Sequence, residues 1–154
     1  MAKFTGASVA AAANSTAANA GIIQVAQGGT VKPIKIYEWE MGPGGAAADN
    51  NYGVLLSRQT TKGTWTNTIT PAPLDGQNAV AATATCYTVS TVAGSAVANS
   101  SLLQVGFNMR AGYRWVAVPG GEFMITPTTL YNIFLGYNYA QGTDSMSASI
   151  MWDE

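Results

Sequence analysis

The chain has 154 residues, with no His, one Cys, seven basic and eight acidic residues, and a formal net charge of −1. This composition excludes a Ser–His–Asp triad and the usual Cys and His clusters that bind zinc, and it provides no basic face for a nucleic acid. The apolar share of 47% supports one folded core in a single domain. No run of about 18 strongly apolar residues predicts a membrane span.

The N-terminal part predicts two strands, Lys3 to Ala10 and Gly21 to Ala26, because both are short apolar runs that end at small or polar residues. Between them, the Ala-rich segment Ala10 to Ala20 favours a helix by propensity, but its Asn, Ser and Thr residues favour a loop or arm. We therefore expect residues 1–30 to form an N-terminal strand and a loop or arm of the same fold, and residues 31–154 to form a β-sandwich domain.

The clearest strand pattern runs from Pro33 to Met41. Alternation places Glu38 and Glu40 on one face with Ile34 and Ile36, and Lys35, Tyr37, Trp39 and Met41 on the other. The first face begins apolar and ends acidic, so we expect the strand to leave the core midway. Two same-face carboxylates on one strand do not flank a glycosidic bond as a hydrolase requires. They indicate a charged strand end that pairs with Arg or Lys.

The rest of the chain alternates short strands with Gly- and Pro-containing turns such as Gly42 to Gly45 and Pro119 to Gly121. Further strands are expected at Tyr52 to Thr60, Gly63 to Thr70, Thr83 to Val92, Ser101 to Met109, Arg114 to Val118, Phe123 to Thr126, Asn132 to Tyr139 and Met146 to Trp152. The Thr row within Gly63 to Thr70 predicts a solvated sheet face. We expect a short helix near Gln77 to Ala82 and a loop from Gly94 to Ser100.

Eight to ten short strands without a long helix or a repeat predict an all-β fold, and a jelly-roll-like β-sandwich fits this count best. Cys86 lies inside a predicted strand without a basic neighbour in sequence, so it is interpreted as a small buried residue. No acid–base pair, nucleophile, cofactor motif or metal cluster emerges. We expect no enzyme activity, no catalytic residue, no cofactor and no bound metal.

Aromatic, Met and Arg residues are the types that protein interfaces favour. Arg110 and Arg114 flank Gly112-Tyr113 and precede Trp115, a pattern typical of a turn with local ion pairs or of a protein contact. The candidate partner contacts are Phe4 in the N-terminal strand, Trp65, Met109, Arg110, Tyr113 and Trp115.

Several segments together carry a resemblance to a known family. They are Glu38 to Gly42, Asp49-Asn50, Ser57 to Thr64, Thr70 to Asp75, Phe107 to Gly112, Val118 to Glu122 and the acidic C-terminal tail. In this order they resemble small virion proteins of tailed phages and prophages. The resemblance implies a capsid decoration, or cement, protein on the outer surface of the phage head, assembled in the host cytoplasm. Its expected partners are the major capsid protein of the same phage and further copies of the chain in a homotrimer, and neither nucleic acid nor membrane.

An alternative of another class stays open. Exposed Trp and Tyr side chains stack on sugars, so the chain could also serve as a receptor-binding or carbohydrate-binding module of a head or tail fibre. Under this hypothesis Trp65 and Trp115 are the residues to test.

Overall fold

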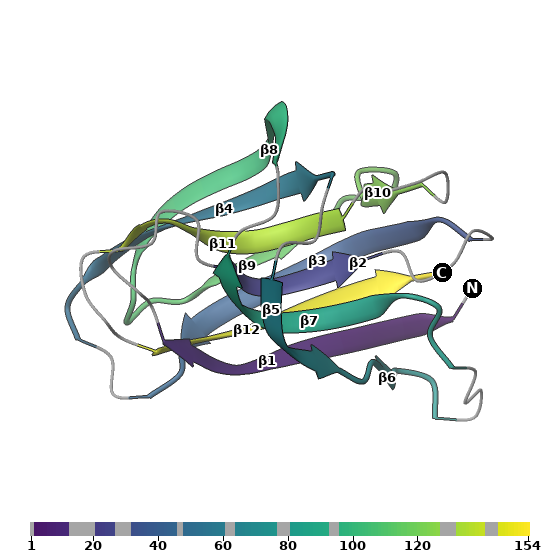
Figure 1. Cartoon of the computed structure of the whole chain (residues 1–154), viewed down its shortest axis with the longest axis horizontal. Helices are drawn as coiled ribbons and strands as arrows, with labels where there is room; N and C mark the ends of the chain where they lie inside the picture. Colours follow the sequence, from purple (N-terminus) through teal and green to yellow (C-terminus); the bar gives the residue numbers. More distant parts are fainter. Residues whose placement is uncertain are drawn as a thin grey trace.

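The structure is a computed structural model, and it describes residues 2–12, 21–26, 32–45, 48–60, 64–76, 81–92, 96–126, 132–140 and 145–154. These residues form twelve strands and no helix (Figure 1). The sequence-based prediction of an all-β fold is therefore confirmed. Three of the strands are very short, and the remainder agree with the expected eight to ten.

Two six-stranded sheets contain all of these strands, and every pairing within them is antiparallel. The first sheet has the order β10 (Phe123–Ile125), β3 (Ile34–Pro43), β12 (Ser145–Asp153), β1 (Lys3–Ala12) and β6 (Ala72–Pro73), with β9 (Tyr113–Val116) also paired to β3. The second sheet has the order β5 (Thr64–Ile69), β7 (Thr85–Val92), β2 (Gly21–Ala26), β11 (Asn132–Ala140), β4 (Asn51–Gln59) and β8 (Ala96–Asn108).

The strand pairs are nested along the chain. The first strand pairs with the last, β2 with β11, β3 with β10 and β9, β4 with β8, and β5 with β7. The first four of these pairs, from the outside inward, lie in the first sheet, the second, the first and the second again, and the innermost pair, β5 with β7, also lies in the second sheet. Strand β1 also pairs with β6, and β2 also pairs with β7, so both are interior strands of their sheets (Figure 1).

The core lies between the two sheets and contains large side chains from both. Phe4, Trp39 and Trp152 of the first sheet and Tyr52 and Cys86 of the second are each at most 1% exposed. Phe4 stacks on Trp152 with ring centroids 6.1 Å apart. Burying one large apolar side chain contributes about 1.5–3 kcal/mol, so this shared core holds the sheets together as a β-sandwich. The prediction that Cys86 is a buried residue is confirmed.

The alternation predicted for Met146 to Trp152 is confirmed in β12. Met146, Ala148, Ile150 and Trp152 are buried, and the serines between them are half-buried on the outer face. The exposed Thr64, Thr68 and Thr70 likewise confirm the solvated Thr row.

The predicted alternation of β3 is wrong in its second half. Met151 pairs with Glu38 but Trp152 pairs with Ile36, so Tyr37 is an extra residue in a β-bulge. The bulge reverses which residues point inward: Ile34 and Ile36 are buried before it, and Trp39 and Met41 are buried after it. The strand therefore does not leave the core midway. Its apolar residues on both sides of the bulge face the same core.

Three further predictions concern where the elements begin and end along the chain. The Ala-rich segment continues β1 as far as Ala12, and residues 13–20 lie outside the described residues. The loop expected from Gly94 to Ser100 is wrong from Ala96 onward, because β8 begins there. The short helix expected near Gln77 to Ala82 falls mainly on residues 77–80, which the structure does not describe.

The turn predicted at Pro119 is confirmed, and it places two strands in line. The N–H of Gly121 donates to the Val118 carbonyl at 2.8 Å, and Gly120 has a φ of +84°. Pro followed by a positive-φ Gly is the pattern of a type II turn. Before this turn β9 pairs with β3, and after it β10 pairs with the same edge of β3.

Candidate functional site

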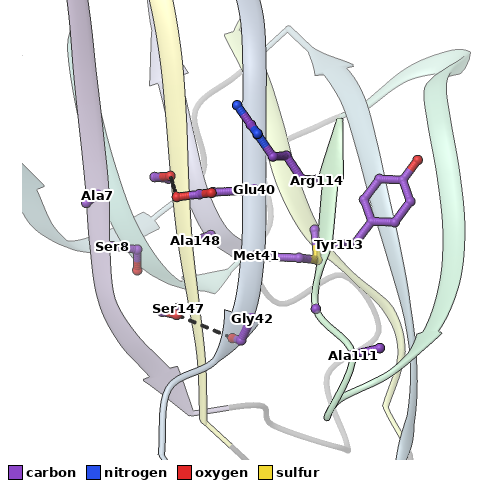
Figure 2. Close-up of a pocket in the computed structure, with 12 residues that line it drawn as sticks. Ala7, Ser8, Glu40, Met41, Gly42, Ala111, Tyr113, Arg114, Ser147 and Ala148 are labelled. Carbon is purple, nitrogen blue, oxygen red and sulfur yellow. Dashed lines mark hydrogen bonds between the residues drawn. The ribbon is translucent and has the colours of Figure 1, made fainter. Parts of the chain in front are cut away.

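The outer face of the first sheet carries a charged cluster that strand register brings together. Arg114 of β9 pairs with Glu40 of β3, which pairs in turn with Ser149 of β12. Because directly opposed residues share a sheet face, all three side chains point away from the core. Figure 2 shows Glu40 beside Arg114, with Tyr113 leaving β9 in a different direction.

Glu40 and the neighbouring Glu38 of β3 both have partners within the chain. Arg114 Nε donates to Glu38 Oε1 at 2.6 Å, and Ser149 Oγ donates to Glu40 Oε1 at 2.9 Å. The hydrogen bond and the charge of Glu38 raise the pKa of Arg114 above its ordinary value. The predicted pairing of the Glu38 end of the strand with a basic residue is thus confirmed. The Arg114 side chain is 63% exposed, so its remaining N–H groups are open to solvent or a partner.

A shallow depression of about 500 Å³ lies beside this cluster. Its lining includes Ala7, Gly42 and Ser147 from three neighbouring strands, with Glu40 and Arg114 as the charged members (Figure 2). Small side chains keep the floor open, and a few hydroxyl and charged groups stand in a lining that is otherwise mostly apolar. Such a lining can hold a polar group of a partner by hydrogen bonds.

Exposed apolar side chains gather along the neighbouring edge of the first sheet. Val116 of β9, Val118 of the following turn and Met124 of β10 are 52%, 72% and 40% exposed. We call these three residues the edge patch. Val116 is opposite Glu38 and Met124 is opposite Lys35, both on the outer side of β3. Exposed apolar groups that share one edge are typical of a contact surface for another protein.

Three aromatic side chains lie on the inner side of the same strands. Trp115 stacks on Phe123 with ring centroids 4.5 Å apart and an interplanar angle of 16°, and both are half-buried. Tyr113 is half-buried as well, with its ring 5.3 Å from that of Trp39. Arg58 of β4 extends from the second sheet and donates to the Met124 carbonyl. These contacts hold β9 and β10, which carry Val116 and Met124 of the edge patch, against the rest of the sandwich.

Two of the predicted partner contacts are wrong because they are core residues. Phe4 is 1% exposed under the stacked ring of Trp152, and Met109 is 0% exposed. The chain turns after β8, where Met109 N–H donates to the Asn50 carbonyl, and this brings the Met109 side chain inward. Neither residue can reach a partner in this conformation.

The other four predicted contacts divide into two places. Arg110, Tyr113 and Trp115 lie close together in sequence, on the turn after β8 and on β9, and Arg110 is exposed. Trp65 lies on β5 of the second sheet, half-buried with its ring 6.3 Å from that of Tyr87. The predicted contacts therefore do not form one surface.

The edge patch itself was missed by sequence reasoning. The available signal was Val118, an apolar residue directly before a Pro-Gly turn, where the chain is exposed. Val116 and Met124 gave a weaker signal, because short strands show too few residues to reveal which face is outside.

The Cys86 thiol is fully buried in the core. Burial raises the pKa of the Cys86 thiol to about 12, so it stays protonated and inert at neutral pH. Among the described residues, no three His, Cys, Asp or Glu side chains gather as metal ligands. The same part of the chain has no helix long and apolar enough to cross a bilayer.

Comparison with known proteins adds no relative. No family model, no curated protein and no solved structure matches this chain.

Proposed function

We propose that this chain is a structural virion protein that decorates the outer surface of a tailed-phage capsid and stabilises its shell by binding the major capsid protein. It acts by adhesion and converts no substrate. The sequence resemblance to small tailed-phage virion proteins supports this proposal. The hydrogen bonds that Glu38 accepts from Arg114 and that Glu40 accepts from Ser149 also support it, because they give both carboxylates a structural role.

The observation that carries the proposal is the edge patch beside the Arg114 cluster. Val116, Val118 and Met124 are the apolar centre of a contact surface, and Arg114, two residues before Val116 on β9, adds a charged group near it. This combination of apolar and Arg side chains is the composition of protein interfaces.

A small patch suits a repeated shell. Three exposed apolar side chains contribute only a few kcal/mol when covered, at roughly 25 cal/mol per Å² of apolar area. That is a weak single contact after the cost of association. Many copies bound to one lattice hold adjacent capsid subunits together, because each shell offers many equivalent sites.

We also infer that the sandwich is a jelly roll. The nested strand pairs alternate between the two sheets from the outside inward, as in a long hairpin rolled over two sheets. Strands β5, β6 and β7 are inserted between β4 and β8 in the sequence. Strand β6 extends the first sheet by one strand, and β7 and β5 extend the second sheet by two.

Counting the chain on purified virions tests the proposed function. Quantitative mass spectrometry should find about one copy per shell subunit or per fixed group of subunits, and cryo-electron microscopy should locate it outside the head. A chain that is missing from mature heads, or present in only a few copies at the tail, contradicts the proposal.

The depression near Arg114 favours one second candidate, a carbohydrate-binding module. Hydroxyl groups of a sugar match its Ser, Glu40 and Arg114 side chains. A glycan array separates the two functions. Binding that Arg114→Ala abolishes, with Trp65→Ala as the control on the other sheet, would favour the sugar.

A further inference from the structure

The four edges of the two sheets differ in how well they are protected against pairing with another strand. In the first sheet, β6 has two residues including Pro73, and the opposite edge is interrupted between β9 and β10 by the turn at Pro119. Proline, short strands and interruptions all prevent edge-to-edge pairing. In the second sheet, β5 has six residues and β8 has thirteen.

Strand β8 is the long edge without such protection. Its sequence, Ala96–Asn108, contains no charged residue and no Pro. Among the described strands it pairs with β4 alone and lies at the end of the second sheet (Figure 1). Register shifts interrupt its first half, but Leu103–Asn108 pairs regularly with β4.

The hydrogen-bond pattern shows which backbone groups of β8 point outward. Met109 N–H donates to the Asn50 carbonyl, so this pair is a hydrogen-bonded pair of the antiparallel ladder. Such pairs alternate with non-hydrogen-bonded ones. Leu103, Val105 and Phe107 are therefore bonded to β4, and the N–H and C=O groups of Gln104 and Gly106 point away from the sheet.

The inward-facing side chains of the same stretch are only partly covered by the rest of the chain. Leu103, Val105 and Phe107 are opposite Leu56, Val54 and Tyr52, which are buried. The three β8 residues face the same core but are only half-buried, because no described strand pairs with the outer side of β8. A further strand at this edge would cover them.

We propose that β8 pairs with β8 of a second copy of this chain, antiparallel and with the twofold axis at Val105. Gln104 of each copy then exchanges backbone hydrogen bonds with Gly106 of the other. Leu103 lies opposite the second copy's Phe107, and Val105 lies opposite Val105, so the apolar core continues across the axis.

The second copy is the occupant that fits this edge best. Two copies of an uncharged strand meet without like-charge repulsion, and the proposed register is apolar against apolar at every inward position. On the outer face it sets Gln104 over Gly106, whose missing side chain leaves room for the amide. The result is a continuous sheet formed from both copies, with twofold symmetry in place of the trimer expected from the resemblance.

A cysteine placed on the proposed axis tests the register. Val105→Cys should form a disulfide-linked dimer when oxidised glutathione is added, because non-hydrogen-bonded opposite residues bring their Cβ atoms close. The buried Cys86 does not compete, since its thiol stays protonated. Thr68→Cys, exposed on the β5 edge of the same sheet, is the matched control and should remain largely monomeric.

A second pair of variants tests the hydrogen bonds. Gly106→Pro removes an outward N–H without removing a bond to β4, and should raise the dimer dissociation constant by about tenfold or more, because two symmetry-related bonds are lost. Gly106→Ala keeps the N–H, and its Cβ would lie 3.9 Å from the Tyr52 carbonyl oxygen, so it should still dimerise.

Sedimentation velocity over a dilution series gives the deciding result. Concentration-dependent dimers of the wild-type chain, together with the Val105→Cys cross-link, support the pairing. A wild-type monomer at every concentration, a trimer by mass, or a Val105→Cys chain that cross-links no faster than Thr68→Cys overturns it. This outcome is separate from the copy count on virions, because dimerisation is measured without any capsid.

Discussion

Gly6 in β1 lies directly against Cys86 in β7, at a point where the two sheets approach each other closely. A Cβ at Gly6 would lie 2.6 Å from the Cys86 Sγ and 3.5 Å from the ring of Trp152. The glycine is therefore required by the packing of the sandwich, and the sulfur fills the space that its missing side chain leaves.

Gly6→Ala should destabilise the fold by about 1–3 kcal/mol, because the added methyl group forces the two sheets apart. Chemical denaturation measures this free energy. Gly6→Ala combined with Cys86→Ala should recover part of the loss, since the clashing sulfur is then absent. If the double variant is no more stable than the sum of the single changes predicts, the proposed contact is wrong.

The Cys86 thiol should make stability depend on alkaline pH. Its pKa is raised from 9.0 to about 12 in the folded chain, so the folded state keeps a proton that the unfolded state loses. This contribution is fully present below pH 9.0 and is lost as the pH rises toward 12, with a slope approaching about 1.4 kcal/mol per pH unit.

Urea denaturation of the wild-type chain and of Cys86→Ala at several pH values measures this effect. The difference in stability should change in favour of Cys86→Ala above pH 9.0. The comparison is needed because burial also raises the pKa of Tyr37, which acts in the same direction in both proteins. Parallel curves for the two proteins would show that the thiol titrates normally.

Loss of Arg114 should destabilise the chain through the group it leaves behind. The Glu38 side chain is only 11% exposed and accepts its ionic hydrogen bond from Arg114. Arg114→Ala should lower the free energy of unfolding in thermal or chemical denaturation, and Arg114→Ala with Glu38→Gln should lower it less. Arg110→Ala, an exposed cation in the nearby turn, is the control and should change stability by less than about 0.5 kcal/mol.

Glu154 should matter for stability because its carboxylate joins the two sheets. It follows β12 of the first sheet, and it accepts hydrogen bonds from the Thr83 N–H at 2.8 Å, the Thr83 hydroxyl and the Ala84 N–H at 3.2 Å, just before β7 of the second. Glu154→Ala should cost about 1–3 kcal/mol, and Glu154→Gln should cost less because one acceptor oxygen remains. Differential scanning calorimetry compares them, and equal melting temperatures for all three chains would contradict this role.

The edge patch should contribute to capsid binding and not to folding. Replacing Val116, Val118 and Met124 by Ser should leave the melting temperature nearly unchanged, because all three side chains are exposed. If the proposed function is correct, the variant should bind purified heads that lack the chain at least tenfold more weakly than the wild type. The matched control is Leu74→Ser, an exposed apolar residue next to β6 at the opposite edge of the sheet. Unchanged binding of the triple variant would exclude the patch as the contact.

Strand positions could be predicted from the sequence because alternation and turn residues are local signals. The clearest success is β12, where four alternating apolar residues are all buried. The failure at β3 has a definite cause: a bulge adds one residue, and a single added residue exchanges the two faces of everything that follows. No local signal at Tyr37 marks that insertion, because it depends on the partner strand.

The contact residues were harder to predict for a related reason. Residue type and spacing show that Phe4 or Met109 is apolar, but burial depends on which distant strand covers it. Phe4 is covered by Trp152, almost the whole chain away, and Met109 by the inward turn at Asn50. Trp115 and Tyr113 are half-buried on the inner side of β9, and the neighbouring valines could be recognised as exposed only once β9 and β10 were seen in line on β3.

The pairing of β1 with β12 has a consequence for biosynthesis. β1 is synthesised well before β12, the strand that pairs along most of its length, so β1 remains without this neighbour while the strands between them emerge from the ribosome. Loop closure over so many residues is slow. The first sheet should therefore close only after β12 has been synthesised, and chaperones that shield nascent β-strands should increase the yield of folded chain.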